Sequence, residues 1–383
     1  MKKEYLLTPG PTPVPPQARE VMARSIIHHR TPAYRKVFQE VSGLLQTVFK
    51  TRNNILTFTS SGTGAMEASV VNLLSKGDKA VVVRGGKFGE RFTEICRAYN
   101  VEAVNIDVEW GTAVNPELVS KALEADKEIS AVFTTLCETS TGVVNDIKAI
   151  GKIVKQHKAV LVVDAISGLC ADNLETDKWE VDVVVAASQK GLMTPPGLAF
   201  VSISPKAWKK AEKAGLPKYY FDFKKAEKGL QKFDSPFTPA ISLMLALRQA
   251  LELIKIEGVD KVLSRHQRLS RATRTAVKSL GLKLLAPESP ANTVTAVRVP
   301  EEIDGSKLIK LIREKYGVTI AGGQAALKGK IIRIAHLGYI NGFDLINGMM
   351  ALEMALGELG YRFKLGSGLI AAEEILSEPE RTG

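Results

Sequence analysis

The sequence contains few cysteines. Cys96, Cys137 and Cys170 are the only three among 383 residues, and no two of them have CxxC spacing. An odd and dispersed set of this kind argues against a disulfide scaffold and against a zinc site. It favours a reducing compartment, so we expect a cytoplasmic protein.

The sequence also lacks long apolar runs. No stretch approaches the roughly 20 apolar residues that a membrane helix needs. The N-terminal residues Met1–Tyr5 lead into a proline cluster instead of an apolar segment, which argues against a signal peptide. We therefore expect no membrane partner.

Basic residues outnumber acidic residues, and the formal net charge is +11. Such an excess can indicate nucleic-acid binding. Here the lysines are spread along the chain, and the densest basic stretch, 206–232, also contains Glu212, Asp222 and Glu227. We expect a solvated basic surface and no nucleic-acid partner. A positive field would also suit anionic cofactors and substrates.

Short apolar segments alternate with helical patterns through most of the chain. Seven strands are expected, at 54–59, 80–83, 103–106, 131–134, 159–163, 181–186 and 198–202. Helices are expected at 32–51, 64–74, 90–99, 116–125, 147–157 and 241–256. Several strands are apolar throughout, as is typical of strands that are covered on both faces. The pattern predicts an α/β fold with a mainly parallel seven-stranded sheet between helices.

The two ends of the chain depart from this pattern. Five prolines between Pro9 and Pro16 argue against a helix or a central strand and predict an extended arm. After Gly258, strands at 293–299, 318–320 and 331–334 alternate with helices at 261–280, 306–316 and 343–359. We therefore expect an N-terminal arm (1–20), a large domain (21–257) and a smaller C-terminal α+β domain (258–383).

Small residues follow the first strand expected in the sheet. Ser61, Gly62 and Thr63 open a helix, where free backbone N–H groups and the helix dipole favour an anion such as phosphate. No Gly-Lys-Ser/Thr sequence completes a P-loop, and Glu67 stands where a dinucleotide fingerprint has its last glycine. A tight strand–helix turn without a ligand is the alternative.

Asp164 directly follows the apolar strand at 159–163. A carboxylate in this position needs a partner, because burial without one is costly or leaves the group protonated. The partner could be a nucleotide-bound magnesium ion, a cationic ring nitrogen or the backbone of a nearby turn. The missing P-loop counts against the nucleotide.

Lys190 emerges after the strand at 181–186, in the sequence Ser188-Gln189-Lys190-Gly191. A surface lysine that keeps its amine in water is the common alternative. Gly191 and the turn Pro195-Pro196-Gly197 favour an inward geometry instead. Desolvation and a nearby positive charge would lower the pKa of the amine, as a Schiff-base lysine requires.

Arg333 interrupts the apolar strand at 331–334. Its planar guanidinium suits a substrate carboxylate, although an arginine on a solvent-facing strand surface is equally compatible. These features together meet the needs of pyridoxal phosphate (PLP), which requires a phosphate cradle, an acid at its ring nitrogen and a lysine at its aldehyde. Phe88 could stack on the cofactor ring or serve core packing alone.

Five segments of the chain resemble the class V aminotransferases of PLP fold type I, and above all the alanine–glyoxylate/serine–pyruvate aminotransferases. They are Leu7–Pro16, Thr59–Ala68, Glu138–Gly142, Val162–Gly168 and Ser188–Gly197. The resemblance covers nearly the whole chain. Its most specific part is the last segment.

The resemblance implies a cofactor role for each matching residue. Lys190 would hold PLP as a Schiff base, Asp164 would pair with the pyridinium nitrogen, and Ile166 would pack on the ring. The remaining contacts would come from Ser61, Gly62, Thr63 and Gln189 at the phosphate, Thr139 at the ring hydroxyl region, and Phe88, which stands where the subgroup often has tryptophan.

The resemblance also implies a homodimer with shared active sites, because the family takes phosphate contacts from the partner subunit. The matching stretch here is Ser235–Ala240, with Thr238 as the expected contact. Arg333 would bind the substrate carboxylate. We expect His28 and His29 to be ordinary surface or interface residues.

The activity implied by the resemblance is transamination. A small amino acid, alanine or serine, would give its amino group to a 2-oxo acid, glyoxylate or pyruvate, while Lys190 moves a proton at the substrate Cα. A transaminase of an aminophosphonate or ureidoglycine and a non-catalytic subunit with the same fold are the alternatives. A cysteine desulfurase or selenocysteine lyase is disfavoured, because no cysteine follows Cys170.

Overall fold

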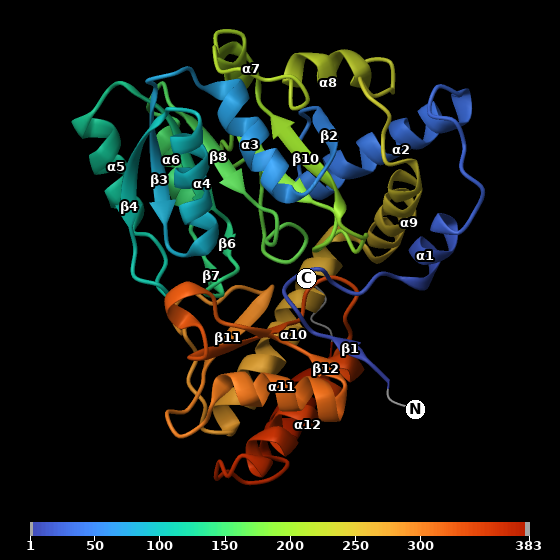
Figure 1. Ribbon diagram of the computed structural model, residues 1–383, viewed down its shortest axis with the longest axis vertical. Helices are drawn as coiled ribbons and strands as arrows, with labels where there is room; N and C mark the ends of the chain where they lie inside the picture. Colours follow the sequence, from blue (N-terminus) through green and yellow to red (C-terminus); the bar gives the residue numbers. More distant parts are fainter. Residues whose placement is uncertain (1–2, 380–383) are drawn as a thin grey trace.

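A computed structural model describes residues 3–379 of the chain. It consists of a larger part with one wide sheet between helices and a smaller part with short sheets and long helices, stacked along the longest axis (Figure 1). After an N-terminal arm that contacts both parts, the chain builds the larger part and then enters the smaller part through helix α10 (Val259–Ser279).

The sheet of the larger part has seven strands in the order β2-β10-β9-β8-β5-β3-β4. These are β2 (Ile55–Ser60), β10 (Gly197–Ile203), β9 (Val183–Ala187), β8 (Val160–Asp164), β5 (Ile129–Thr135), β3 (Lys79–Arg84) and β4 (Glu102–Asp107). Strand β10 runs antiparallel to β2 and β9, and the other neighbours pair in parallel. All residues of β8 and β9 are buried. The prediction of an α/β fold with a mainly parallel seven-stranded sheet is confirmed.

The helices expected around this sheet are present. They are α2 (Pro32–Phe49), α3 (Gly62–Leu73), α4 (Lys87–Ala98), α5 (Pro116–Ala125), α6 (Ile147–Val154) and α9 (Ile241–Glu257). Three short helices were not expected: α1 (Pro16–Met22), α7 (Pro205–Ala211) and α8 (Phe223–Leu230). Helix α1 begins at Pro16. Proline is compatible with the first position of a helix, because the N–H that it lacks would have no partner there. The extended arm therefore ends at Pro15, where we had expected it to continue.

The smaller part combines two small sheets with four helices. Its three-stranded antiparallel sheet has the order β11 (Val294–Arg298), β14 (Ile331–Ala335) and β13 (Ala321–Gly322). Besides α10, its helices are α11 (Gly305–Tyr316), α12 (Gly342–Glu358) and α13 (Ser367–Leu376), the last of which was not expected. A short hairpin of β6 (Cys137–Glu138) and β7 (Val143–Val144) extends from the larger part toward it (Figure 1).

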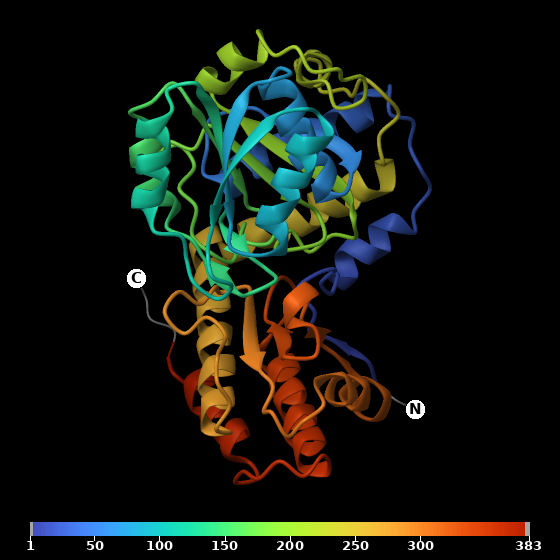
Figure 2. The same cartoon turned by 60° about the vertical axis from the view of Figure 1, so that its left-hand side comes forward.

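The N-terminal arm joins the two parts. Strand β1 (Tyr5–Leu6) pairs in parallel with β12 (Val318–Thr319) of the smaller part, and Leu7 is buried in that part's hydrophobic core. Farther along, the backbone N–H of Thr12 donates to the oxygen of Gln189 in the larger part at 3.1 Å. Figure 2 shows the start of the arm beside the helices of the smaller part. The arm thus contacts both the smaller part and the larger part.

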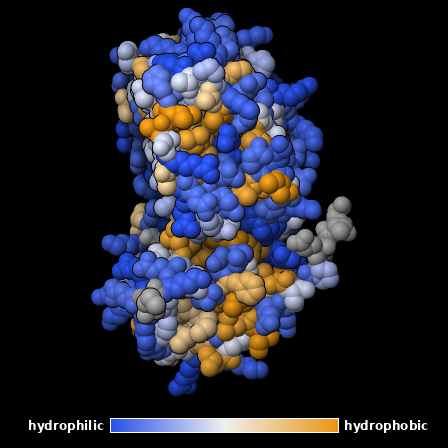
Figure 3. Space-filling view, turned by 90° about the vertical axis from the view of Figure 1, so that its right-hand side faces the viewer, coloured by the Kyte–Doolittle hydropathy of each residue, from blue (hydrophilic) through white to orange (hydrophobic). Residues whose placement is uncertain are grey.

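The two largest hydrophobic cores support these parts, one in each. The larger core includes Val262 of α10, whereas Leu269 of the same helix belongs to the smaller core. Apolar side chains also gather on the surface of the smaller part (Figure 3). The domain boundary that we expect between residues 257 and 258 lies shortly before this change of core within α10, and it stays a prediction. None of the helices within residues 3–379 combines the length and apolar character of a bilayer-spanning helix.

Candidate active site

Four adjacent strands bring the candidate residues to one edge of the large sheet. Strands β2, β8 and β9 end at this edge, and β10 begins there because it runs antiparallel. The register places Gly197 opposite Ser60 and Asp164 opposite Val185. Residues that follow these strands therefore lie close together, at the edge where α/β folds bind ligands.

Lys190 lies in the turn between β9 and β10 and points toward the N-terminal arm. Its amine donates to the backbone oxygen of Pro9, and its own backbone oxygen accepts from Thr12 Oγ1 at 3.1 Å. Gly10 lies so close that a Cβ there would overlap the lysine amine. Burial lowers the pKa of Lys190 to about 8. The structure thus places this lysine inward, as the turn sequence predicts.

Asp164 ends β8 and is buried. One carboxylate oxygen accepts the backbone N–H of Ile166 at 2.8 Å. Burial raises the pKa of Asp164 to about 7, and the positive charges of Arg91 and Lys190 act in the opposite direction. A further cation beside this carboxylate would favour its ionised form.

The N-terminus of α3 forms a narrow cradle. Ser61 is the N-cap residue, but its side chain caps no backbone N–H. A Cβ on Gly62 would lie 2.6 Å from Ile166 Cδ1, so a larger residue here would require the Ile166 side chain to shift. Gln189, the residue before Lys190, has a buried Oε1 without a hydrogen-bond partner among the described residues. Uncapped N–H groups at a helix start favour an anion.

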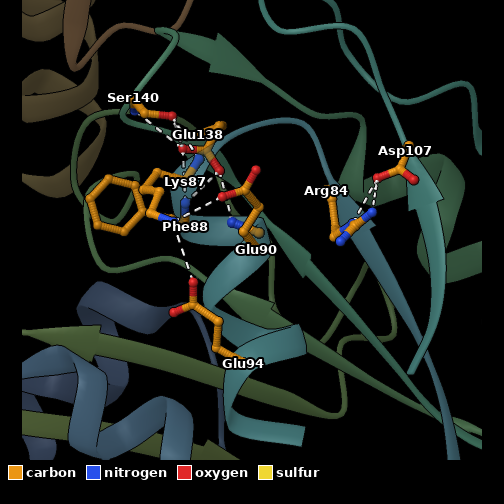
Figure 4. Close-up of polar contacts among 9 residues, drawn as sticks. Arg84, Lys87, Phe88, Glu90, Glu94, Asp107, Glu138 and Ser140 are labelled. Carbon is orange, nitrogen blue, oxygen red and sulfur yellow. Dashed lines mark hydrogen bonds and ion pairs between the residues drawn. The ribbon is translucent and has the colours of Figure 1, made fainter. Parts of the chain in front are cut away.

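Phe88 stands in the first turn of α4 and is fixed by Glu138. The buried Glu138 carboxylate accepts the backbone N–H groups of Phe88 and Gly89, at 3.1 and 2.9 Å, and the Ser140 hydroxyl at 2.6 Å. Figure 4 shows these contacts, with the Phe88 ring extending away from the carboxylate. Burial raises the pKa of Glu138, while the hydrogen bonds that it accepts oppose that shift.

Arg91, one turn after Phe88, connects two of the candidate residues. Its guanidinium carbon lies 4.9 Å from the centre of the Phe88 ring, and its Nη1 donates to Thr63 Oγ1 at 3.2 Å. The Arg91 side chain therefore connects the Phe88 ring with the first turn of α3.

Arg333 reaches the same region from β14 of the smaller part. Its Nε donates to the oxygen of Gly322 and its Nη1 to the oxygen of Thr139, each at 2.9 Å. Thr139 in turn lies 2.5 Å, between hydroxyl oxygens, from Ser167. Burial lowers the pKa of Arg333, and the negative charge of Glu138 opposes that shift. Arg333 is thus a buried cation, and the alternative of a solvent-facing strand arginine is wrong.

Thr238 lies apart from this cluster. It is exposed, on a segment that contacts the end of β2 through the hydrogen bond from Ala240 N to Thr59 Oγ1 at 3.1 Å. His28 is also exposed, and its ring lies 4.7 Å from that of His29. A phosphate contact of Thr238 across a subunit interface stays a prediction.

A family model described as aminotransferase class-V matches residues 5–339. The chain belongs to the class V aminotransferase family. Membership makes pyridoxal phosphate the cofactor of this aminotransferase, and amino acids and 2-oxo acids its substrates.

Individual relatives cover almost the full chain. It is 42% identical to the soluble hydrogenase, small subunit, of Synechococcus over 98% of this chain and 99% of that one. It is 36% identical to serine–glyoxylate aminotransferase of Methylorubrum extorquens over 98% of this chain and 96% of that one. The crystal structure of ureidoglycine–glyoxylate aminotransferase from Bacillus subtilis superposes with a TM-score of 0.94 at 26% identity, covering 99% of each chain.

The residues of this aminotransferase fit PLP. The uncapped start of α3 provides backbone N–H groups that can donate to a phosphate. Asp164 is a buried carboxylate whose pKa is raised by burial, and Lys190 is an amine whose pKa is lowered by burial. These are the groups that the anionic, pyridinium and aldehyde portions of PLP require.

Sequence reasoning missed Glu138 and Arg91 as parts of the site. Glu138 belongs to one of the segments that resemble the family, but its role depends on backbone N–H groups that sequence spacing does not reveal. Arg91 follows Phe88 by three positions, a spacing at which side chains on a helix meet. That spacing could have indicated the stacked pair, although not the bond to Thr63.

Proposed function

We propose that this aminotransferase transfers the amino group of alanine or serine to glyoxylate or pyruvate, with Lys190 as its catalytic residue. The observation that supports this most strongly is the buried Lys190 amine, whose pKa is lowered to about 8 at the strand edge that also carries Asp164. A pKa of about 8 leaves part of the amine neutral near physiological pH, and the neutral amine can bond an aldehyde and accept a proton.

Each proposed cofactor contact follows from the chain's own groups. When bound, PLP supplies an aldehyde that condenses with amines and a ring that withdraws electrons from the substrate Cα. The Asp164 carboxylate would hold a proton on the ring nitrogen. Ile166 and Phe88 would bracket the ring, and Thr139 would contact its hydroxyl region. Ser61, Gly62, Thr63 and Gln189 would bind the phosphate.

Arg333 and Lys190 would act on the substrate. The guanidinium of Arg333 has no described protein acceptor for Nη2, although its Nε and Nη1 are held by backbone oxygens. A substrate carboxylate bound there would be oriented relative to the cofactor. The amine of Lys190 would then take the proton from the substrate Cα and deliver it to the cofactor carbon.

The choice of donor rests on resemblance. The relative from Methylorubrum extorquens is named for serine and glyoxylate, and the Bacillus subtilis structure for ureidoglycine and glyoxylate. Glyoxylate is common to both names, which supports it as acceptor. Ureidoglycine or an aminophosphonate remains the alternative donor.

A subunit without turnover of its own is the rival function, and the name of the Synechococcus relative favours it. Metal centres built from thiolates need several cysteines in one place. Here Cys96, Cys137 and Cys170 are each buried and free, and no group of three or more potential metal-binding residues occurs within 3–379. This chain's own residues therefore support transamination better than a thiolate-bound metal centre.

We further propose that the chain acts as a homodimer in the cytoplasm. The family resemblance supports the dimer, and the exposed Thr238 is available for the phosphate site of a partner subunit. The unpaired cysteines are compatible with a reducing compartment.

The direct test is a panel of amino donors against glyoxylate, pyruvate and 2-oxoglutarate. Purified protein should turn over alanine or serine with glyoxylate or pyruvate, and Lys190→Ala should abolish steady turnover while PLP stays bound without a covalent link. Turnover that survives Lys190→Ala would refute the role of this lysine. A protein that cannot be loaded with PLP would support the rival subunit role.

A further inference from the structure

Arg91 is a half-buried cation that contacts two of the residues proposed to line the PLP site. It projects from the first part of α4, where Phe88 provides one wall, and it reaches the first turn of α3, where Thr63 belongs to another. Its contacts are the Phe88 ring, at 4.9 Å from the guanidinium carbon, and Thr63 Oγ1, at 3.2 Å from Nη1.

We propose that Arg91 is a positioning residue for the cofactor, which fixes the Phe88 ring and the Thr63 hydroxyl relative to each other. The inference rests on the proposed roles of these two residues as stacking and phosphate groups.

The geometry favours this role over a surface cation. A guanidinium over an aromatic face is held by the ring quadrupole, and the interaction is stronger when water is partly excluded. The same planar group also donates to a hydroxyl, which restricts its rotation and that of the threonine. The Phe88 backbone is already held by Glu138, so Arg91 supplies the constraint on the ring itself.

The charge of Arg91 adds a second effect. It lies close enough to Asp164 and Lys190 to lower the pKa of both groups, although burial is the largest influence on each. An ionised Asp164 and a neutral Lys190 are the forms that PLP requires. Arg91 thus favours the correct protonation state of both while it orients the walls.

Substitution of Arg91 tests the proposal through cofactor binding instead of turnover. Arg91→Met should raise the dissociation constant for PLP by about tenfold, and it should change the circular dichroism of the bound cofactor, because the ring loses its fixed support. Arg91→Lys keeps a cation near the ring and should restore affinity to within about threefold of the original protein. Arg97→Met is the matched control, since Arg97 is exposed on the same helix; it should change neither quantity.

A double-variant cycle separates positioning from general stability. If Arg91 acts through Thr63, the effects of Arg91→Met and Thr63→Val on PLP binding should combine to clearly less than their product. The proposal is overturned if Arg91→Met binds PLP within twofold of the original protein with unchanged circular dichroism. It is also overturned if the two effects multiply fully or if Arg97→Met causes the same loss. Failure of the original protein to bind PLP would instead refute the proposed function.

Discussion

The amine of Lys190 donates a hydrogen bond to the backbone oxygen of Pro9, a residue 181 positions earlier in the chain. The arm that carries Pro9 begins as a strand of the smaller part, and Ala335 N donates to the oxygen of Leu7 at 2.9 Å. One continuous segment therefore connects the strand of Arg333 with the amine of Lys190. The proposed substrate-binding and catalytic groups share a structural link.

The protonation state of the Lys190 amine should govern the rate at which the cofactor-free protein binds PLP covalently. The pKa of this amine is about 8, below its usual 10.5, because the amine is buried. It is protonated and unreactive below that pH, so the capture rate should rise by nearly tenfold per pH unit up to about 8 and then level off. Stopped-flow absorbance measures this rate. A rate that keeps rising toward pH 10 would show that the amine is not desolvated.

Asp164 should make the cofactor-free protein less stable as pH rises. Burial raises its pKa to about 7 in the folded chain from the usual 3.8, so the folded form binds the proton more tightly. This stabilisation is complete below pH 4 and is lost as pH rises through 7. Asn at this position cannot titrate and can still accept the Ile166 N–H.

Urea unfolding of both cofactor-free proteins at pH 5 and pH 8 tests this effect. Between these two values the original protein should lose about 3 kcal/mol more unfolding free energy than Asp164→Asn, since each pKa unit corresponds to about 1.4 kcal/mol. Equal losses in the two proteins would mean that burial does not raise the pKa of Asp164.

Gly62→Ala should damage the phosphate cradle. The added Cβ would lie 2.6 Å from Ile166 Cδ1 and 3.1 Å from the Ala187 Cβ, so Ile166 must move. We expect a loss of about 1–3 kcal/mol in unfolding free energy, as in other overpacked sites, with weaker PLP binding. The second change Ile166→Val removes Cδ1 and should recover part of both losses. No recovery would place the damage elsewhere.

Arg333→Ala should raise the KM for alanine or serine by about 10–100-fold, because a charge-assisted hydrogen bond contributes roughly 1.5–3 kcal/mol. Steady-state kinetics measures the change. The thermal unfolding midpoint must be recorded in parallel, since Arg333 also holds the oxygens of Gly322 and Thr139. Unchanged kinetics would mean that the substrate carboxylate binds another group.

The sequence predicted the large sheet well because most of its strands are buried on both faces. Runs such as Val160–Val163 contain no polar residue, so their type and order are readable without tertiary information. Residues at the ends of those runs, Asp164 and Lys190, were predicted for the same reason. A charged group next to an apolar strand is conspicuous in the sequence.

The short helices show where local reading was incomplete. Ser204 caps α7 through the Ala207 N–H, and Asp222 caps α8 through the Lys225 N–H. Both residues are N-cap signals that the sequence displays. Helix α13 has no such signal, since Gly366 precedes it without a side-chain cap. Its stability depends on packing against α10, which no local pattern reveals.

The contacts of Glu138, Arg91 and Pro9 were beyond sequence reasoning for a different reason. Each joins segments that are distant along the chain, and two of the three involve backbone atoms. Spacing along one helix or strand identifies which residues share a face. It does not identify which loop lies opposite that face.

The central claim is that Lys190 carries the cofactor. Borohydride reduction of the PLP-loaded protein, followed by mass-spectrometric mapping of modified lysines, tests it most directly. We expect the phosphopyridoxyl group on the peptide that contains Lys190 and its absence in Lys190→Ala. Modification of another lysine instead, or no stable modification in protein that binds PLP, would contradict the account.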